Sequence, residues 1–150
     1  MNVLFRLLTI YLLVPWVILL LIPKSVLSRK LLLDRRYWLG VGGLYFLALF
    51  FFAWDVNWVQ FLLPTTEGIR EAFQHENLPL FVWVHMVAVN LFMGRWIAED
   101  GFKKGFFLFP FLLVTLLLGP VGLSFYFVYK GKKDAKRQKR RTYRAREERS

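Results

Sequence analysis

The sequence contains no cysteine, which excludes disulfide bonds, thiolate metal sites, iron–sulfur clusters and cysteine nucleophiles. Its two histidines, His75 and His85, belong to no HExxH or related ligand motif, so we expect no metal site. Walker loops, nucleophile elbows and dinucleotide fingerprints are also missing, because the glycines of residues 40–43 open an apolar segment and do not follow a strand. The sequence therefore predicts no bound cofactor.

Acidic residues are scarce, since 10 Asp and Glu stand against 21 Lys and Arg. Apolar residues make up 57% of the chain and aromatic residues 19%, which exceeds the apolar share of an ordinary soluble domain. The last 21 residues hold 11 of the bases and only three of the acids. This division predicts a membrane domain over residues 1–129 and a basic tail over residues 130–150 that is disordered or lies on a membrane surface.

Four apolar segments approach the length of about 20 residues that a helix needs to cross a bilayer. They cover residues 3–22, 38–54, 78–97 and 106–129. Backbone groups in lipid must pair within the chain, and these runs are too long for barrel strands, so we predict an all-α integral membrane bundle of four transmembrane helices. The first segment could instead be a signal peptide cleaved near residues 26–28, but its length and Lys24 favour a retained helix.

The composition between the second and third segments is mixed and acidic. Thr65 or Thr66 can cap a helix that runs from about Glu67 to Gln74. Its apolar residues fall on one side, as they do in helices that lie in the membrane interface. We therefore predict a short interfacial helix between the second and third membrane helices.

Counting of charges leaves the membrane topology open. Residues 23–37 include five bases, and Lys103 and Lys104 follow the third segment, which places both connections in the cytoplasm. Four full crossings would then place the basic tail on the opposite side, which the positive-inside rule disfavours. Three solutions remain. The charges of the tail determine the orientation and the first connection lies outside, or the charges of the connections determine it, or the fourth segment turns back at Gly119-Pro120 without crossing. A cytoplasmic tail is the favoured outcome.

Ionisable residues in a membrane helix are costly and usually face a partner or a wet cavity. His85, Arg95 and Glu99 of the third segment and its exit share one broad helical face. Because histidine ionises near neutral pH, we predict His85 as a catalytic proton-transfer group, with Arg95 and Glu99 orienting a polar group of the substrate. Simpler interpretations stay open: His85 can bond a backbone carbonyl in the core, and Arg95 can extend towards water.

A second set of residues is assigned either to a substrate pocket or to helix packing. Asn90 and Gly94 point to a different side of the third segment from His85, while Trp96 and Asp100 lie towards its exit. Gly119-Pro120 interrupts the hydrogen bonds of the fourth segment, so a kink there either widens a pocket or serves packing alone.

The bases that follow the fourth segment are expected to contact anionic lipid headgroups, at about 1 kcal/mol for each base near the surface. They are Lys130, Lys132, Lys133, Lys136 and Arg137. Nucleic acid is disfavoured as a partner, because Tyr143 is the one aromatic residue of the tail that could stack on a base. An acidic protein partner stays open as an alternative.

The stretch His85–Ile97, HMVAVNLFMGRWI, followed by Glu99-Asp100-Gly101, resembles the abscisic-acid-deficient-four-like membrane family. Residues 118–123, LGPVGL, are similar to the closing Gly-Pro-x-Gly signature of that family. The family includes the plastid protein required for neoxanthin formation and many bacterial relatives of unknown function. The resemblance therefore implies four membrane helices and a role in converting or handling an isoprenoid or carotenoid.

Two functions follow, and the sequence does not decide whether the protein is an enzyme. The first is an acid/base isomerisation of a lipophilic small molecule in the membrane. The alternative is a non-enzymatic scaffold or assembly factor that binds other membrane proteins, with the basic tail contacting anionic lipid or a cytoplasmic partner. For either function we expect an integral protein of the bacterial inner membrane, or of a plastid membrane in a eukaryote.

Overall fold

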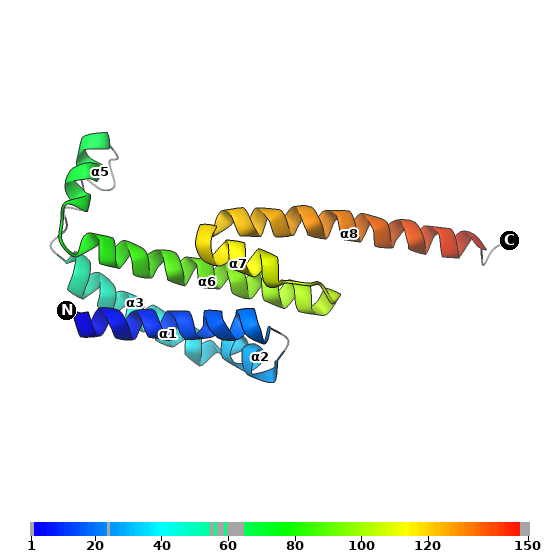
Figure 1. Ribbon diagram of the computed structural model, residues 1–150, viewed down its shortest axis with the longest axis horizontal. Coiled ribbons are helices and arrows are strands. Elements are labelled where there is room, and N and C mark those ends of the chain that lie inside the picture. Colours follow the sequence, from blue (N-terminus) through cyan, green and yellow to red (C-terminus); the bar gives the residue numbers. More distant parts are fainter. Residues whose placement is uncertain (1, 24, 55, 57–58, 60–64, 148–150) are drawn as a thin grey trace.

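The computed structural model describes residues 2–23, 25–54, 56, 59 and 65–147, and it contains helices and no strand over these ranges (Figure 1). The helices are α1 (Asn2–Leu21), α2 (Val26–Leu33), α3 (Arg35–Ala53), α5 (Thr66–Phe73), α6 (Leu78–Lys104), α7 (Phe109–Leu118) and α8 (Pro120–Glu147). The prediction of an all-α fold is confirmed for the described residues.

Three helices, α1, α3 and α6, are long and apolar enough to cross a bilayer. They match the first three predicted segments, although α6 continues seven residues beyond its predicted end at Ile97. It ends where Gly105 adopts a left-handed φ of 65° and the amide of Phe106 donates to the carbonyl of Gly101. Many large apolar side chains on the outer faces of the three helices are exposed, as lipid-facing residues would be.

Helix α6 is the centre of the bundle, since α1, α3, α7 and α8 all pack against it. Its buried side chains include Val84, Leu91 and Ile97. Trp16 of α1 lies so close to Gly94 that a Cβ atom at that position would collide with the indole ring. A small residue at position 94 therefore lets α1 approach α6 closely, as small residues do in membrane helix pairs.

The fourth predicted membrane segment is not a continuous helix. The chain reverses at Gly119, and α8 returns antiparallel to α7, so that Phe111 packs against Tyr126 with 5.7 Å between ring centroids (Figure 1). Helix α7 has only 10 residues and is about 15 Å long, half the thickness of the hydrocarbon core. The described residues therefore form three candidate membrane helices where we predicted four, and residues 106–129 turn back at Gly119-Pro120.

Two glycines make this reversal sterically possible. Gly119 has a φ of 49° and a ψ of −105°, a backbone conformation that side chains with a Cβ atom rarely adopt. A Cβ atom on Gly122 would overlap the backbone of Thr115, so α8 passes close to α7 only because glycine occupies this position. Pro120 is the first residue of α8, where its missing N–H leaves no helical hydrogen bond unmade.

The reversal leaves carbonyl groups at the end of α7 without helical donors. In a continuous helix the carbonyl of Leu116 would accept the amide of residue 120, but Pro120 has no N–H. Buried Asn90 of α6 replaces that donor, because its Nδ2 lies 3.2 Å from the carbonyl oxygen of Leu116. The Oδ1 atom of Asn90 lies directly against Gly119. One side chain of α6 therefore fixes the hairpin to the bundle.

The short connecting helices are capped by hydroxyl groups. Helix α5 confirms the helix predicted after residue 65, since the hydroxyl of Thr65 accepts the amide of Gly68 at 3.0 Å. Helix α2 lies in the basic connection after α1, where we predicted no helix. The hydroxyl of Ser25 accepts the amide of Ser28 at 2.9 Å and so starts α2.

Helix α8 continues through Lys130 to Glu147, so residues 130–147 are helical, and their position on a membrane surface stays a prediction. The basic half of α8 extends past the end of the bundle (Figure 1). The same end of the bundle holds α2, the start of α3 and the end of α6, while the N-terminus and α5 lie at the opposite end (Figure 1). The reversal at Gly119 therefore brings the tail to the end that already carries both basic connections.

Replacing Asn90 by Ala should lower the free energy of unfolding by about 1–3 kcal/mol, because the Leu116 carbonyl loses its donor in a buried site. Denaturation by sodium dodecyl sulfate in mixed micelles measures this difference. Val89→Ala, at an exposed neighbouring position of α6, is the control and should change stability little. Equal stabilities of the two variants would contradict the role given to Asn90.

Candidate functional site

His85 lies on the outer face of α6 beside Tyr45 of α3. The hydroxyl of Tyr45 is 2.7 Å from Nδ1 of His85, and the two ring centroids are 5.6 Å apart. Phe81, one turn earlier on α6, packs against both rings. Because His85 is exposed on the bundle surface, this hydrogen-bonded pair is open to a molecule that approaches from outside the bundle. A phenol and an imidazole that share a hydrogen bond can donate and accept protons.

Arg95 lies further along the same interface between α3 and α6. Its guanidinium carbon is 5.1 Å from the centroid of the Trp38 ring, which is a cation–π contact. The ring of Phe92 packs edge-on against Trp38 at 5.7 Å. We call this row of side chains the α3–α6 seam. It comprises Trp38, Tyr45, Phe81, His85, Phe92 and Arg95.

The three predicted catalytic residues are spread along α6 and do not form one compact group. Ten residues separate His85 from Arg95, which is about 15 Å along a helix. Glu99 pairs with Lys103 at 3.8 Å, and the ion pair that its spacing allows with Arg95 is not formed between these two described residues. Over the described ranges, no three His, Asp or Glu side chains are placed to share a metal ion.

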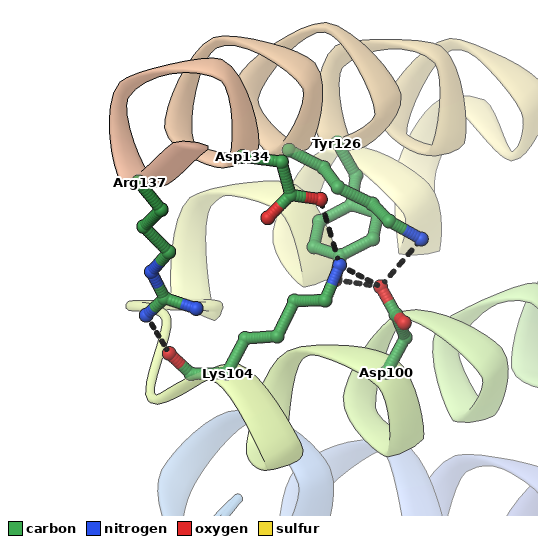
Figure 2. Close-up of polar contacts among 6 residues, drawn as sticks. Asp100, Lys104, Tyr126, Asp134 and Arg137 are labelled. Atoms are coloured by element: carbon green, nitrogen blue, oxygen red, sulfur yellow. Dashed lines mark hydrogen bonds and ion pairs between the residues drawn. The ribbon is translucent and has the colours of Figure 1, made fainter. Parts of the chain in front are cut away.

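A denser polar cluster lies where the end of α6 faces α8 (Figure 2). The Oδ2 atom of Asp100 accepts a hydrogen bond from the Tyr126 hydroxyl at 2.6 Å and lies 3.0 Å from Nζ of Lys130. Nζ of Lys104 is 3.8 Å from the same oxygen and 2.9 Å from Oδ2 of Asp134. The hydrogen bond to Asp100 raises the pKa of Lys130, so this lysine stays charged at neutral pH.

This polar cluster holds α8 parallel to α6. The contacts join residues that are about 30 positions apart, as in the pairs of Asp100 with Lys130 and of Lys104 with Asp134. Trp96 extends the series, because its ring packs against that of Tyr126 with 6.0 Å between centroids. A constant offset along two helices is what parallel packing produces. The cluster is therefore a clamp between α6 and α8.

The residues assigned to a pocket or to packing make contacts between helices. Asn90 bonds the end of α7 and lies against Gly119, Gly94 lies against Trp16, and Pro120 starts α8. A role for any of them in a substrate pocket stays a prediction.

The five bases predicted to contact headgroups have different surroundings. Lys130 belongs to the polar cluster, while Lys133 and Arg137 lie over aromatic rings. Lys132 and Lys136 are exposed on α8. Contact of these bases with lipid stays a prediction.

Sequence reasoning missed the partners of the predicted residues. Trp38 and Tyr45 lie seven residues apart on α3, a spacing that places them on one helical face and could have signalled the seam. Tyr126 and Lys104 gave no such signal, because the residues they contact on the facing helix are 26 and 30 positions away. Only the packing of α8 on α6 brings these partners together.

The family model described as ABA DEFICIENT 4-like matches residues 3–126. A curated relative, Protein ABA DEFICIENT 4, chloroplastic, from Arabidopsis thaliana, is 26% identical over 114 residues, which cover 72% of this chain and 51% of the relative. The chain thus spans about half the length of that relative, and no solved structure matches it. Because the family model covers the seam, the Gly119 reversal and most of the chain, the protein belongs to the ABA DEFICIENT 4-like family.

Proposed function

We propose that the protein acts in a membrane on an isoprenoid or carotenoid, which it converts by acid/base isomerisation. The observation that carries this proposal is the 2.7 Å hydrogen bond between Tyr45 and His85 on the outward side of the α3–α6 seam. Family membership supports the substrate class. The exposed apolar faces of α1, α3 and α6 support a location in lipid.

The α3–α6 seam has the chemistry to bind an elongated apolar molecule. Phe92 and Trp38 offer aromatic surface along it, and His85 and Arg95 mark two polar positions about 15 Å apart. An isomerisation conserves the atoms of the substrate, since a base removes one proton and an acid returns one elsewhere. His85 and Tyr45 would exchange these protons, while Arg95 and, one turn further, Glu99 would orient a polar end of the substrate.

For the membrane topology, we propose that α1, α3 and α6 cross the bilayer, while the α7–α8 hairpin enters it from one side and returns. Three crossings place the tail and both basic connections on one side and the N-terminus on the other. The positive-inside rule then assigns the basic side to the cytoplasm of a bacterial cell, or to the equivalent side of a plastid membrane. This topology removes the conflict between the charges of the connections and of the tail.

A scaffold that binds other membrane proteins is the alternative function. A row of aromatic side chains on α3 and on the residue that follows it, away from the seam, favours it. The exposed residues are Phe46, Phe50, Phe51 and Trp54. Exposed aromatic rings are common at protein interfaces.

Cysteine labelling tests the topology directly, because the chain has no cysteine of its own. Gln74→Cys, just after α5, and Ala135→Cys, on α8, place single thiols at exposed positions on opposite ends of the bundle. In intact cells, a membrane-impermeant maleimide should label Gln74→Cys, and it should label Ala135→Cys only after permeabilisation. Labelling of Ala135→Cys in intact cells would contradict the topology.

Replacing His85 by Ala should reduce product formation by about 100-fold or more, because the proton-transfer group is lost. Chromatography of pigments and isoprenoids extracted from a deletion strain that carries each variant measures the effect. Tyr45→Phe should cause a smaller loss, and Met86→Ala, at the adjacent exposed position, is the control and should restore the wild-type profile. Full restoration by His85→Ala would remove the basis for catalysis and favour the scaffold.

A further inference from the structure

Two cavities adjoin at the turn between α6 and α7. The first, of about 480 Å³, lies between the end of α1 and this turn, and we call it the apolar cavity. Its lining includes Leu20, Leu21, Phe102, Phe107, Leu108 and Phe109. The second, of about 280 Å³, lies between the same turn and α8, and we call it the cationic groove. Gly105 and Phe106 line both cavities, so an apolar space and a polar space meet at one buried ring.

Four bases of α8 line the cationic groove, and their spacing places them on one helical face. They are Lys133, Lys136, Arg137 and Arg140. Two aromatic rings line the groove beside these bases. The guanidinium carbon of Arg137 is 5.4 Å from the centroid of the Phe106 ring, and Nζ of Lys133 is 5.5 Å from that of Tyr129. Nη2 of Arg137 also donates to the carbonyl of Lys104 at 2.8 Å, which fixes its side chain across the groove.

The acids nearest to the groove are already paired with other bases. Asp134 bonds Lys104, and Asp100 bonds Lys130 (Figure 2). Within the described part of the chain, no carboxylate forms an ion pair with any of the four groove bases. Neighbouring like charges on a helix face repel one another. A bound anion would relieve this repulsion, and Arg and Lys side chains are the usual ligands of phosphate groups.

We propose that the two cavities together bind one anionic phospholipid, with its phosphate in the cationic groove and an acyl chain in the apolar cavity. The shared wall at Phe106 matches the junction between the head and the tail of an amphiphile. A free phosphate would need the groove alone, and a neutral hydrocarbon would need the cavity alone. The combined volume of the two cavities, about 760 Å³, suits one bound molecule, since ligand pockets usually measure about 300–1,000 Å³.

The site lies at the basic end of the bundle, where headgroups would lie in the topology proposed above. The inference therefore rests on the membrane location but not on the isomerisation. Neither His85 nor Tyr45 lines either cavity, so a failure of one proposal leaves the other in place.

Lipid binding can be titrated by native mass spectrometry of the full chain, purified and delipidated in a neutral detergent, with phosphatidylglycerol as the probe. Lys136→Gln with Arg140→Gln removes two exposed groove bases and should weaken binding about tenfold or more. Lys139→Gln with Arg141→Gln removes one lysine and one arginine from α8 outside the groove and is the matched control. The control should change affinity by no more than about threefold.

The apolar cavity is tested separately. Leu21→Trp, at an exposed position of its lining, partly fills the cavity. This variant should weaken binding of long-chain phosphatidylglycerol about tenfold and leave a dihexanoyl form unchanged. Equal effects on both chain lengths would place the acyl chain elsewhere and overturn the combined site.

Three results would contradict the headgroup assignment. Equal losses in the groove and control double variants would mean diffuse attraction to the tail rather than a discrete site. Phosphatidylcholine that binds as tightly as phosphatidylglycerol would remove the role of the groove charge. Tighter binding of a C20 isoprenyl diphosphate than of phosphatidylglycerol would replace the phospholipid by an isoprenoid occupant.

Discussion

The hydrogen bond from Asn90 to the carbonyl of Leu116 holds a chain reversal on which the rest of the structure depends. The reversal at Gly119 returns α8 along α7 and then along α6. If the fourth segment were one helix, its basic continuation would leave the bundle at the end that carries α5. The polar cluster around Asp100 would then lack its residues from α8, and the cationic groove would not form.

In the proposed membrane location, the reversal also requires internal hydrogen bonding. A carbonyl without a donor is tolerated in water, but in hydrocarbon it costs several kcal/mol. Non-helical backbone at membrane depth is therefore stable only where neighbouring groups satisfy it. Asn90 does so for the carbonyl of Leu116, and the amide of Gly119 donates to the carbonyl of Thr115 at 2.8 Å. The similarity of residues 118–123 to a Gly-Pro-x-Gly signature thus has a structural reason.

Features that depend on local sequence could be predicted. Apolar length identified α1, α3 and α6, and a hydroxyl before an acidic turn identified α5 with its cap at Thr65. The fate of the fourth segment could not be predicted, because a kink and a full reversal begin with the same Gly119-Pro120 pair. The outcome depends on how closely Gly122 passes Thr115 and on a donor from α6. The structure of the tail could not be predicted for the same reason, because contacts with α6 hold its first turns.

The candidate site shows a similar division between what was and was not predictable. Periodicity placed His85, Arg95 and Glu99 on one face of α6, yet it could not reveal that they bond different partners. Tyr45 comes from α3 and lies 40 residues from His85 in sequence. Glu99 forms its ion pair with Lys103, although its spacing would also allow a pair with Arg95. Reasoning from one helix therefore placed these residues on one face of α6 but could not identify their partners on α3 and α6.

A distance between two spin labels tests the reversal most directly. Phe107→Cys and Val128→Cys, both at exposed positions, can carry the labels in a chain that has no other cysteine. A continuous helix would separate these positions by about 32 Å. The hairpin instead predicts a separation typical of adjacent helices, whose axes lie about 8–10 Å apart, as the 5.2 Å between the Phe106 and Tyr129 ring centroids requires. A measured distance near 32 Å in a lipid bilayer would contradict the account.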